Sequence, residues 1–554
     1  MSREVYSGRR LEPETETSIE RVFAQLNNRG QKRIILGLLI TGLLLVCPTG
    51  FLGGQVPTAE EQVTRASDLV QAGDLKGAEE ELRLAVELSP RESRYWAHLG
   101  IVLGMQQRLE ESATCFDKAL KLDPTNLEVR RNLAVKEWQL GRLATAAENL
   151  EVILKAHPTD AHAILLRGMV AEGLKNYPEA AKLLASVLPL VEQRPESTVA
   201  LGNAYYRIGE KVKARETLLY LLNQTADAEG VFLGGQVAAN EEDYVTAETL
   251  FLSIQRTYPD PGRLGYSLAL AQYRDNRFAE SRRTILDLTH AGRQTAEIYS
   301  LLGWCYQRQK NYDESVAAFE RAIDLDPKKE ANYVDLGLVL IGFRRYAAAD
   351  AMAQKAVEAL PASSKVYEVK GMAEILMQDY ADAERSYARA SQLNPQSAEA
   401  NLGLAESQWA ARNVHEAFAT FEEGLKQFPQ DALHFQEYGR ALLKYAEAGD
   451  ALAEARAVTM LNKAVALDGS LPEPDYLLGN LALRKGRTEE ALQHLEQASR
   501  LDPKGGKIHF ALSLAYRRLG RKADAIREFE IFQKLKAKEE KAPAASLLAG
   551  AAED

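Results

Sequence analysis

A pattern of small and apolar residues recurs about every thirty-four residues, from Ala59 to the polar end of the chain. A period of this length indicates stacked copies of one short unit, because each copy can bury its apolar face only against its neighbours. The block that starts at Ala296, taken as offset 1, shows the pattern at offsets 4, 7, 8, 11, 20, 24, 27 and 32, with Tyr299, Leu302, Gly303, Tyr306, Ser315, Phe319, Ala322 and Pro327. We therefore expect an array rather than a domain with one central pocket.

Other blocks carry matching residues at these offsets. From Ser93 they are Trp96, Leu99, Gly100, Leu103, Ser112, Phe116, Ala119 and Pro124, and from Glu330 they are Tyr333, Leu336, Gly337, Leu340, Ala349, Ala353, Ala356 and Pro361. Fourteen blocks are found, each thirty-four residues from the next except for one step of thirty-three and one of forty. They start at Ala59, Ser93, Leu127, Ala161, Pro195, Ala228, Gly262, Ala296, Glu330, Ser364, Ala398, Ala432, Pro472 and Gly506.

Each block is expected to form a helical hairpin. Apolar residues fall at helical spacing in two stretches, and a turn sequence such as 309–311 separates them. Small residues at offsets 8 and 20 allow the two helices to approach closely where they cross. Proline at offset 32 has no N–H and cannot lie inside the next helix, so it ends the second helix of the block.

These residues resemble the tetratricopeptide repeat, whose pattern is an aromatic residue, a Leu-Gly pair, a tyrosine, two alanines flanking a phenylalanine and a closing proline. The resemblance covers nearly all of the chain after residue 58. It implies an all-α fold, a right-handed α-solenoid of about fourteen helical hairpins. It also implies that the first helices of the hairpins form a concave face.

Three blocks depart from the pattern. The fourth runs through Pro189 and Glu192 without a clean stop, so an irregular joint is expected there. In the seventh, Gln272 replaces the tyrosine and no proline closes the block. The twelfth contains about six extra residues between Tyr445 and Arg456, and we favour a lengthened hairpin over a functional loop because surface insertions cost little free energy.

Length and charge narrow the class of partner. A chain of 554 residues is too long for one core, whereas an array grows without enlarging any core. The formal charge of −10 argues against nucleic acid as the main partner, because phosphate binding needs clustered Lys and Arg. We therefore expect protein partners, no nucleic acid and no small-molecule substrate.

An uncharged run from Ile34 to Ala59 precedes the array. About twenty apolar residues span a bilayer, so a transmembrane helix at 34–56 is predicted. Basic residues, including Lys32 and Arg33, lie before the run, and the next one after it is Arg65. Under the positive-inside rule, this predicts a single-pass inner (cytoplasmic) membrane protein with a cytoplasmic N-terminus and a periplasmic array.

Two other interpretations of the run were weighed. A cleaved signal has a short basic start, whereas residues 1–33 are longer and carry five acids, so an uncleaved anchor is favoured. Lipidation at Cys47 is disfavoured because the bulky Val46 precedes it. The predicted organisation is a cytoplasmic segment 1–33, the membrane helix 34–56, the array 59–539 and a flexible tail 540–554.

A short amphipathic helix is predicted before the run. Thr17 and Glu20 have capping-box spacing, and Gly30 follows as a stop. The apolar stripe of this helix, spaced i, i+3, i+4, i+7, is Ile19, Val22, Phe23 and Leu26. The stripe is either a membrane-surface contact or a docking site for a partner.

The sequence contains no catalytic, metal-binding or cofactor-binding pattern. Cys47 falls in the apolar run, and Cys115 and Cys305 fall at core-like offsets of repeats far apart in sequence. The eight histidines are scattered, and the paired glycines at 53 and 234 lack the lysine of a phosphate-binding loop. We expect no cofactor, no metal and no enzymatic activity.

The resemblance implies that offsets 2, 5, 9 and 12 of the first helices face the concave groove. Large apolar side chains at these offsets are candidate anchors for a protein partner. They are Tyr206, Phe232, Tyr266, Tyr273, Trp304, Leu338, Ile341, Met372, Ile375, Trp409, Tyr476 and Phe510, and the eighth to eleventh repeats carry the most apolar set. A carboxylate clamp is not expected, because Asn203 and Asn480 lack the matching Lys and Arg in neighbouring repeats.

Three functions were compared. One anchor, fourteen repeats and no catalytic residues favour a noncatalytic scaffold that assembles or stabilises a cell-envelope complex of the secretion, pilus, polysaccharide-export or respiratory type, with membrane or exported proteins as partners. An import or chaperone receptor on an organelle surface, with the array in the cytosol, is the alternative. An enzyme such as a repeat-bearing sugar transferase is disfavoured, because no span of domain size remains for a catalytic fold.

Overall fold

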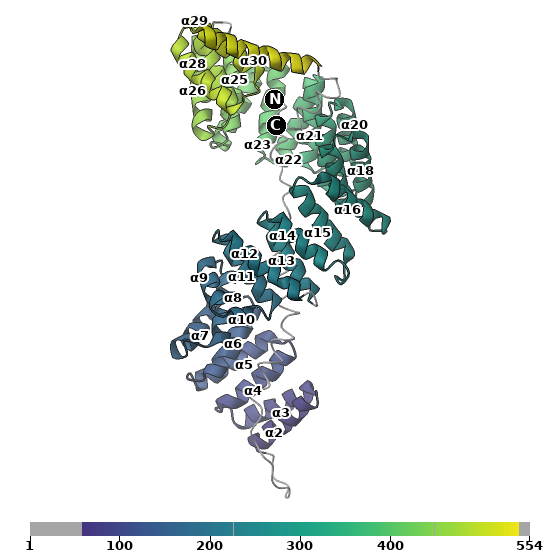
Figure 1. Cartoon of the computed structure of the whole chain (residues 1–554), viewed down its shortest axis with the longest axis vertical. Coiled ribbons are helices and arrows are strands. Elements are labelled where there is room, and N and C mark those ends of the chain that lie inside the picture. The colour runs from purple at the N-terminus through teal and green to yellow at the C-terminus, as the bar shows by residue number, and fades with distance from the viewer. Residues whose placement is uncertain (1–57, 225–226, 448, 542–554) are drawn as a thin grey trace. The chain divides into compact units, whose positions relative to one another are not determined.

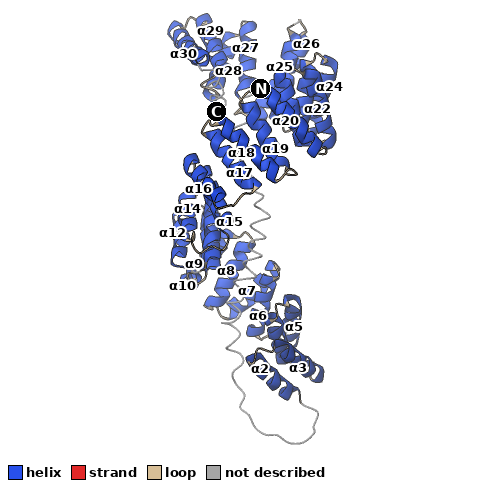
Figure 2. Ribbon diagram, turned by 90° about the vertical axis from the view of Figure 1, so that its right-hand side faces the viewer, coloured by secondary structure: helices blue, strands red, loops and turns tan. Residues whose placement is uncertain are grey.

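The computed structural model describes residues 58–541 apart from 225–226 and 448 (Figure 1). Within these ranges the only regular structure is helical, with twenty-nine α-helices and one short 3-10 segment (Figure 2). The residues fall into two compact units, which meet in sequence between Thr284 and Ile285. In each unit, consecutive helices pack against one another in chain order.

The unit before Ile285 contains the first six hairpins and the start of the seventh. Its helices are α2 (Ala59–Gln71), α3 (Leu75–Leu88), α4 (Ser93–Met105), α5 (Leu109–Leu122), α6 (Leu127–Gln139), α7 (Leu143–Ala156), α8 (Ala161–Gly173), α9 (Tyr177–Ser186), α10 (Leu188–Val191), α11 (Pro195–Arg207), α12 (Lys211–Leu219), η1 (Tyr220–Gln224), α13 (Ala228–Asn240), α14 (Tyr244–Ser253), α15 (Pro261–Arg274) and the first part of α16 (Phe278–His290).

The unit from Ile285 contains the rest of α16 and seven further hairpins. Its helices are α17 (Ala296–Arg308), α18 (Tyr312–Leu325), α19 (Glu330–Gly342), α20 (Tyr346–Ala359), α21 (Ser364–Met377), α22 (Tyr380–Leu393), α23 (Ala398–Ala410), α24 (Val414–Gln427), α25 (Ala432–Ala446), α26 (Ala451–Leu467), α27 (Pro472–Arg484), α28 (Thr488–Leu501), α29 (Gly506–Arg518) and α30 (Lys522–Lys541).

The predicted repeats match these helices closely. The first helix of each hairpin begins at the predicted residue, except in the seventh, where α15 begins at Pro261 instead of Gly262. The all-helical array of hairpins is therefore confirmed, because residues needed for packing recur with the period. The right-handed sense of the superhelix stays a prediction.

The small residue at offset 8 allows the two helices of a hairpin to touch. A Cβ atom added to Gly303 would lie 2.6 Å from the Phe319 ring, and one added to Gly100 would lie 2.9 Å from the Phe116 ring. Both rings are almost fully buried. The side chain at offset 24 therefore fills the space that glycine leaves on the facing helix.

The serine at offset 20 has a role that the sequence interpretation did not include. The Ser112 hydroxyl donates to the Gly100 carbonyl at 2.6 Å, and the Ser315 hydroxyl donates to the Gly303 carbonyl at 2.9 Å. Both serines are fully buried. The serine hydroxyl thus forms a hydrogen bond between the two helices where they cross. This bond also pairs the buried hydroxyl donor.

One residue in each hairpin turn has a left-handed backbone. Glycine takes this place in several repeats, for example Gly141 with φ of 75° and Gly486 with φ of 75°. In others a side chain is present, as at Lys310 with φ of 63° and Arg344 with φ of 56°. The turn geometry is therefore kept even where glycine is absent, at a cost of about 1 kcal/mol per residue.

The two expected irregularities are confirmed. In the fourth repeat the second helix breaks at Val187, and the short α10 with Pro189 in its first turn follows. In the twelfth repeat the extra residues lengthen the hairpin, so that α25 has 15 residues and α26 has 17. No separate loop domain is formed by the described part of this insertion.

The predicted membrane localisation is contradicted. Among the helices of residues 58–541, none is long and apolar enough to cross a membrane. The predicted segments 1–33 and 34–56 and the stripe Ile19, Val22, Phe23 and Leu26 lie outside the described residues. The tail from 542 also lies outside them.

Gly303→Val should lower the stability of the array, because the added atoms would overlap the buried Phe319 ring. Overpacking of this kind costs about 1–3 kcal/mol. The midpoint of urea unfolding, followed by far-ultraviolet circular dichroism, measures the change. Gly506→Ala is the control, because its added Cβ would meet no atom of another residue closer than 3.8 Å. Equal midpoints for Gly303→Val and the wild-type chain would contradict this packing.

Candidate functional site

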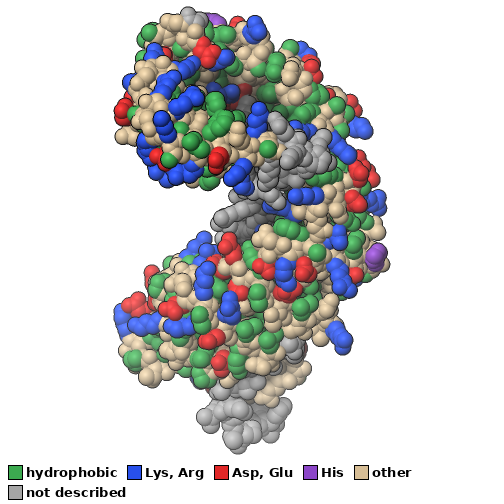
Figure 3. Space-filling view, turned by 45° about the horizontal axis from the view of Figure 1, so that its top comes forward, with side chains coloured by type: hydrophobic (Ala, Val, Ile, Leu, Met, Phe, Trp, Pro, Cys, Tyr) green, Lys and Arg blue, Asp and Glu red, His purple; other side chains and the backbone are tan. Residues whose placement is uncertain are grey.

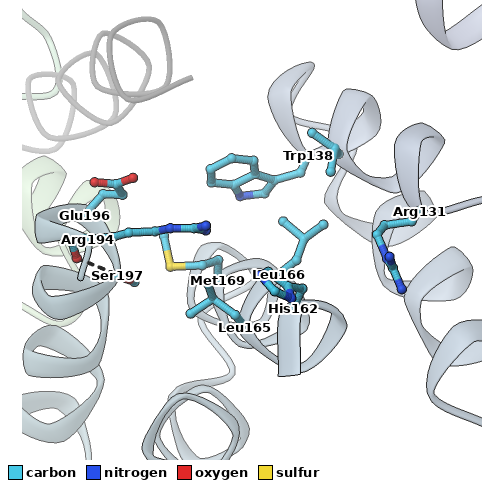
Figure 4. A pocket seen from close by; sticks show the side chains of 10 residues that line it. Arg131, Trp138, His162, Leu165, Leu166, Met169, Arg194, Glu196 and Ser197 are labelled. Carbon is cyan, nitrogen blue, oxygen red and sulfur yellow. Dashed lines mark hydrogen bonds between the residues drawn. The ribbon is translucent and has the colours of Figure 1, made fainter. Parts of the chain in front are cut away.

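A pocket opens on the first helices of the third, fourth and fifth repeats (Figure 4). Its volume is about 50 Å³. Most of its lining comes from offsets 2, 5, 9 and 12, the offsets expected to face the groove. These lining residues are Arg131, Val135 and Trp138 from α6, His162, Leu165 and Met169 from α8, and Glu196 from α11.

Helix caps fix the backbone around the pocket. The Asn126 side chain accepts from the Val129 N–H at 3.1 Å where α6 begins, and the Asp160 side chain accepts from the Ala163 N–H at 3.1 Å where α8 begins. Ala134 and Ala163, on the same two helices, are fully buried. The pocket side chains are therefore presented by two anchored helices rather than by a loop.

The pocket has an apolar floor. Leu165 is buried, whereas Leu166, Met169 and Trp138 keep part of their surface open. Figure 4 shows the Trp138 indole, Leu166 and Met169 around one space. An indole face and a thioether beside branched side chains suit an aliphatic or aromatic group of modest size.

Two arginines lie at the sides of the floor. The Arg131 guanidinium is already paired, since it donates to the Asp160 carboxylate. The Arg194 side chain reaches over Met169 toward Trp138 (Figure 4). Within residues 58–541, apart from the gaps, the Arg194 guanidinium has no hydrogen-bond or ion-pair partner. One cationic group therefore faces the apolar space, and the Glu196 carboxylate lines the same pocket.

The base of Arg194 is held by the start of α11. Its carbonyl oxygen accepts from the N–H groups of Ser197 at 3.1 Å and Thr198 at 3.1 Å. The Ser197 hydroxyl also donates to this carbonyl at 3.0 Å. The backbone of Arg194 is thus fixed by three hydrogen bonds to its carbonyl.

A second polar contact lies beyond the pocket on the same helices. The Asn203 amide donates to the Glu172 carboxylate at 2.6 Å. Burial raises the pKa of Glu172, and the hydrogen bond from Asn203 opposes the rise. Asn203 is therefore engaged within the array by Glu172.

The arrangement can bind, and its chemistry favours one class of group. An apolar space beside an unpaired guanidinium complements an apolar side chain that lies next to a carboxylate. In the described residues, no cluster of His, Cys, Asp and Glu could hold a metal ion. Acidic and basic side chains are interspersed over the face seen in Figure 3.

The structure places some predicted groove residues in the core. Phe232 is fully buried, stacks on Tyr258 at 4.6 Å and contacts Phe251 at 5.5 Å between ring centroids. The Arg263 guanidinium lies 4.4 Å from the centre of the same ring. Phe232 is therefore a packing residue, because neighbouring aromatic rings and the arginine enclose it.

Three others are also buried. The Tyr206 hydroxyl donates to the Asp243 carboxylate at 2.9 Å, and burial together with this carboxylate raises the pKa of Tyr206. Leu338 and Ile341 belong to an apolar cluster around α19. These side chains have little surface left for a partner.

The remaining predicted residues keep part of their surface open. The half-buried ones are Tyr266, Tyr273, Trp304, Met372, Ile375, Trp409 and Tyr476, and Phe510 is exposed. Trp409 stacks on Phe418 with ring centroids 5.8 Å apart. Their role in binding stays a prediction.

The sequence interpretation missed the pocket although its own rule points there. Trp138 stands at offset 12 of the third repeat and Met169 at offset 9 of the fourth. Both lie outside the eighth to eleventh repeats, which carry the most apolar groove set. Arg194 precedes offset 1 of the fifth repeat, so no offset rule could have found it.

Comparison with known families identifies the repeats. Sequence models described as tetratricopeptide repeat match residues 93–126, 131–198, 296–329, 374–437 and 476–550. The match at 131–198 covers most of α6, all of α8 and the first residues of α11, which are the helices that line the pocket.

Named relatives share parts of the array. A peroxisomal targeting signal receptor of Kluyveromyces lactis is 35% identical over 78 residues, which are 14% of this chain and 14% of the receptor. The type IV pilus assembly protein PilF of Pseudomonas aeruginosa is 26% identical over 203 residues, which are 36% of this chain and 79% of PilF. The chain therefore spans only a small part of the peroxisomal receptors that it matches.

The crystal structure of yeast Tom70 aligns with 89% of this chain and 95% of its own, at 17% identity and a TM-score of 0.40. The Cut9–Hcn1 structure aligns with 90% of this chain and 96% of its own, at 15% identity and a TM-score of 0.35.

Phe232→Ala should destabilise the fold, because it removes a fully buried ring. Truncation of a buried phenylalanine costs about 3–5 kcal/mol. Leu452→Ala is the control, since Leu452 is 73% exposed and should change stability little. Urea unfolding of both variants measures the difference. If Phe232→Ala were as stable as the control, the packing role of Phe232 would be contradicted and Phe232 would again be a candidate groove anchor.

Proposed function

Since this chain carries tetratricopeptide repeats, we propose that it is a noncatalytic scaffold that binds protein partners and assembles them into a complex. The observation that carries the proposal is the unpaired Arg194 guanidinium beside the apolar floor of Trp138, Leu166 and Met169. The partner segment that fits is an apolar side chain next to a carboxylate.

The geometry favours a peptide over a folded surface. The pocket is small, and one first helix after another supplies its lining. A peptide that crosses α6, α8 and α11 places one side chain on the floor and one carboxylate against Arg194. The carboxylate is either an Asp or Glu side chain or the end of the partner chain.

The named relatives support assembly as the task of the scaffold. PilF carries the name of a type IV pilus assembly protein and aligns over 203 residues. We propose that this chain likewise gathers subunits of a multiprotein assembly, of which a cell-envelope complex of the pilus type is the leading class.

A receptor is the second candidate. The peroxisomal targeting signal receptor has the higher identity, 35%, over a shorter alignment. A receptor of this kind would bind one short signal at a time, whereas a scaffold would hold two partners together. Cross-linking of the chain in native extracts distinguishes them, because only a scaffold yields links to two partners in one complex.

The pocket is tested with peptides displayed at random against the full chain. Peptides with an apolar residue next to an acidic group should be enriched on the wild-type protein. Arg194→Glu should weaken the selected peptides about tenfold or more, because the carboxylate then faces a like charge. Trp138→Ala should weaken them as well, because it removes part of the floor.

The matched control is Arg256→Glu, which reverses an exposed arginine after α14, away from the pocket. Its affinity should equal that of the wild-type chain. Amidated and free C-terminal versions of each peptide show whether the carboxylate is terminal or internal. Equal affinity of the wild-type and Arg194→Glu proteins for every selected peptide would refute the proposed site.

A further inference from the structure

The last repeat ends in an apolar surface that the other repeats cover. At offset 24, the side chain is at most 5% exposed in the first eleven repeats and in the thirteenth, as with Phe116, Phe251, Phe319 and Phe421. In the twelfth repeat the insertion shifts the equivalent place to Leu461, which is fully buried. In the fourteenth repeat the same offset is Phe529, which is 40% exposed. Phe529 is thus the usual packing residue, but the described chain contains no further repeat to cover its ring.

The cover is supplied elsewhere by the next first helix. Phe116 packs with Val129 and Leu133 of α6. Phe251 packs in the same way with Leu264 and Leu268 of α15. In both cases two apolar residues four positions apart lie over the ring, which is one turn of a helix.

Neighbouring side chains extend the uncovered surface. Ile526 is 60% exposed and Phe510 is 41% exposed. The Phe532 ring lies 5.1 Å from that of Phe510 and 5.9 Å from that of Phe529, measured between centroids. We name the four residues Phe510, Ile526, Phe529 and Phe532 the C-terminal end face.

The other end of the array is built differently. In α2, Arg65 stands at offset 7, where most other repeats have a leucine. Arg65 is exposed. A polar outer helix of this kind closes an array, and it also makes α2 of a second copy a poor cover for the end face.

The described chain does not turn after α30 to form a helix over Phe529. A typical second helix, α28, ends at Leu501, and the next first helix begins at Gly506. By contrast, α30 has 20 residues and continues to Lys541. Six residues beyond the usual 14 carry the chain about 9 Å further along the helix axis.

We propose that the C-terminal end face binds an amphipathic helix of a partner protein, which takes the place of the first helix of an added repeat. The face continues the interface that already joins one repeat to the next. The partner helix should therefore present two apolar residues four positions apart, as α6 and α15 do. This inference is independent of the pocket at Arg194.

The test uses a labelled synthetic peptide with the sequence of α6, residues 127–139, as the probe. Fluorescence anisotropy should show binding to the full chain, and the peptide with Val129→Ser and Leu133→Ser should not bind. Ile526→Asp should weaken the probe about tenfold or more, because it places a charge in an apolar contact.

Two variants of the end face, Ile526→Asp and Phe529→Asp, are measured with the probe, because they differ in their expected effect on the fold. Ile526 is mostly exposed, so its variant should keep the fold, whereas the loss of Phe529 can loosen the last repeat. Circular dichroism of each variant checks the fold. Val212→Asp is the matched control, since Val212 is 69% exposed on α12 and lies outside the end face. Equal binding by the wild-type chain and Ile526→Asp would overturn the proposal.

Two further outcomes would also overturn it. If analytical ultracentrifugation shows a wild-type dimer that Ile526→Asp dissociates, a second copy covers the face. If a chain that ends at Lys541 binds the probe about tenfold more tightly than the full chain, residues 542–554 cover it. Binding by the monomeric full chain, lost in Ile526→Asp and kept in Val212→Asp, supports the partner helix.

Discussion

The array depends on the close approach of two helices at the small residue of offset 8. Where glycine stands there, as at Gly303, the ring at offset 24 lies directly against the backbone of the facing helix. The serine at offset 20 then reaches the carbonyl of the same residue. The same ring is covered from the other side by the next first helix, so the packing within a hairpin and the packing between hairpins share one side chain.

Because the packing depends on offsets 8, 20 and 24, the residues at the groove-facing offsets of the first helices can vary. The packing offsets 8 and 20 are filled by Gly, Ala or Ser and offset 24 mostly by Phe or Leu, whereas the groove offsets range from Glu196 to Trp138. Binding chemistry can therefore change without loss of the fold. The pocket of repeats three to five is one result of this freedom.

The repeat boundaries were predictable because the packing residues recur with a fixed period. The burial of single groove residues was not, since an offset gives a direction but not the neighbours: Phe232 faces Tyr258 and Phe251, which enclose it. Arg194 stands before offset 1 and escaped the pattern. The left-handed backbone of Lys310 could not be predicted from its residue type, because lysine has no preference for that conformation. The predicted membrane localisation failed, because no described helix can span a bilayer.

We propose that partners bind to the first helices of repeats three to five. Hydrogen exchange of the full chain, measured by mass spectrometry with and without a peptide selected on it, tests this claim directly. We expect slower exchange in α6, α8 and the start of α11 when the peptide is bound, with α7 and the second helices elsewhere unchanged. Protection confined to second helices, or to repeats that do not include these three, would contradict it.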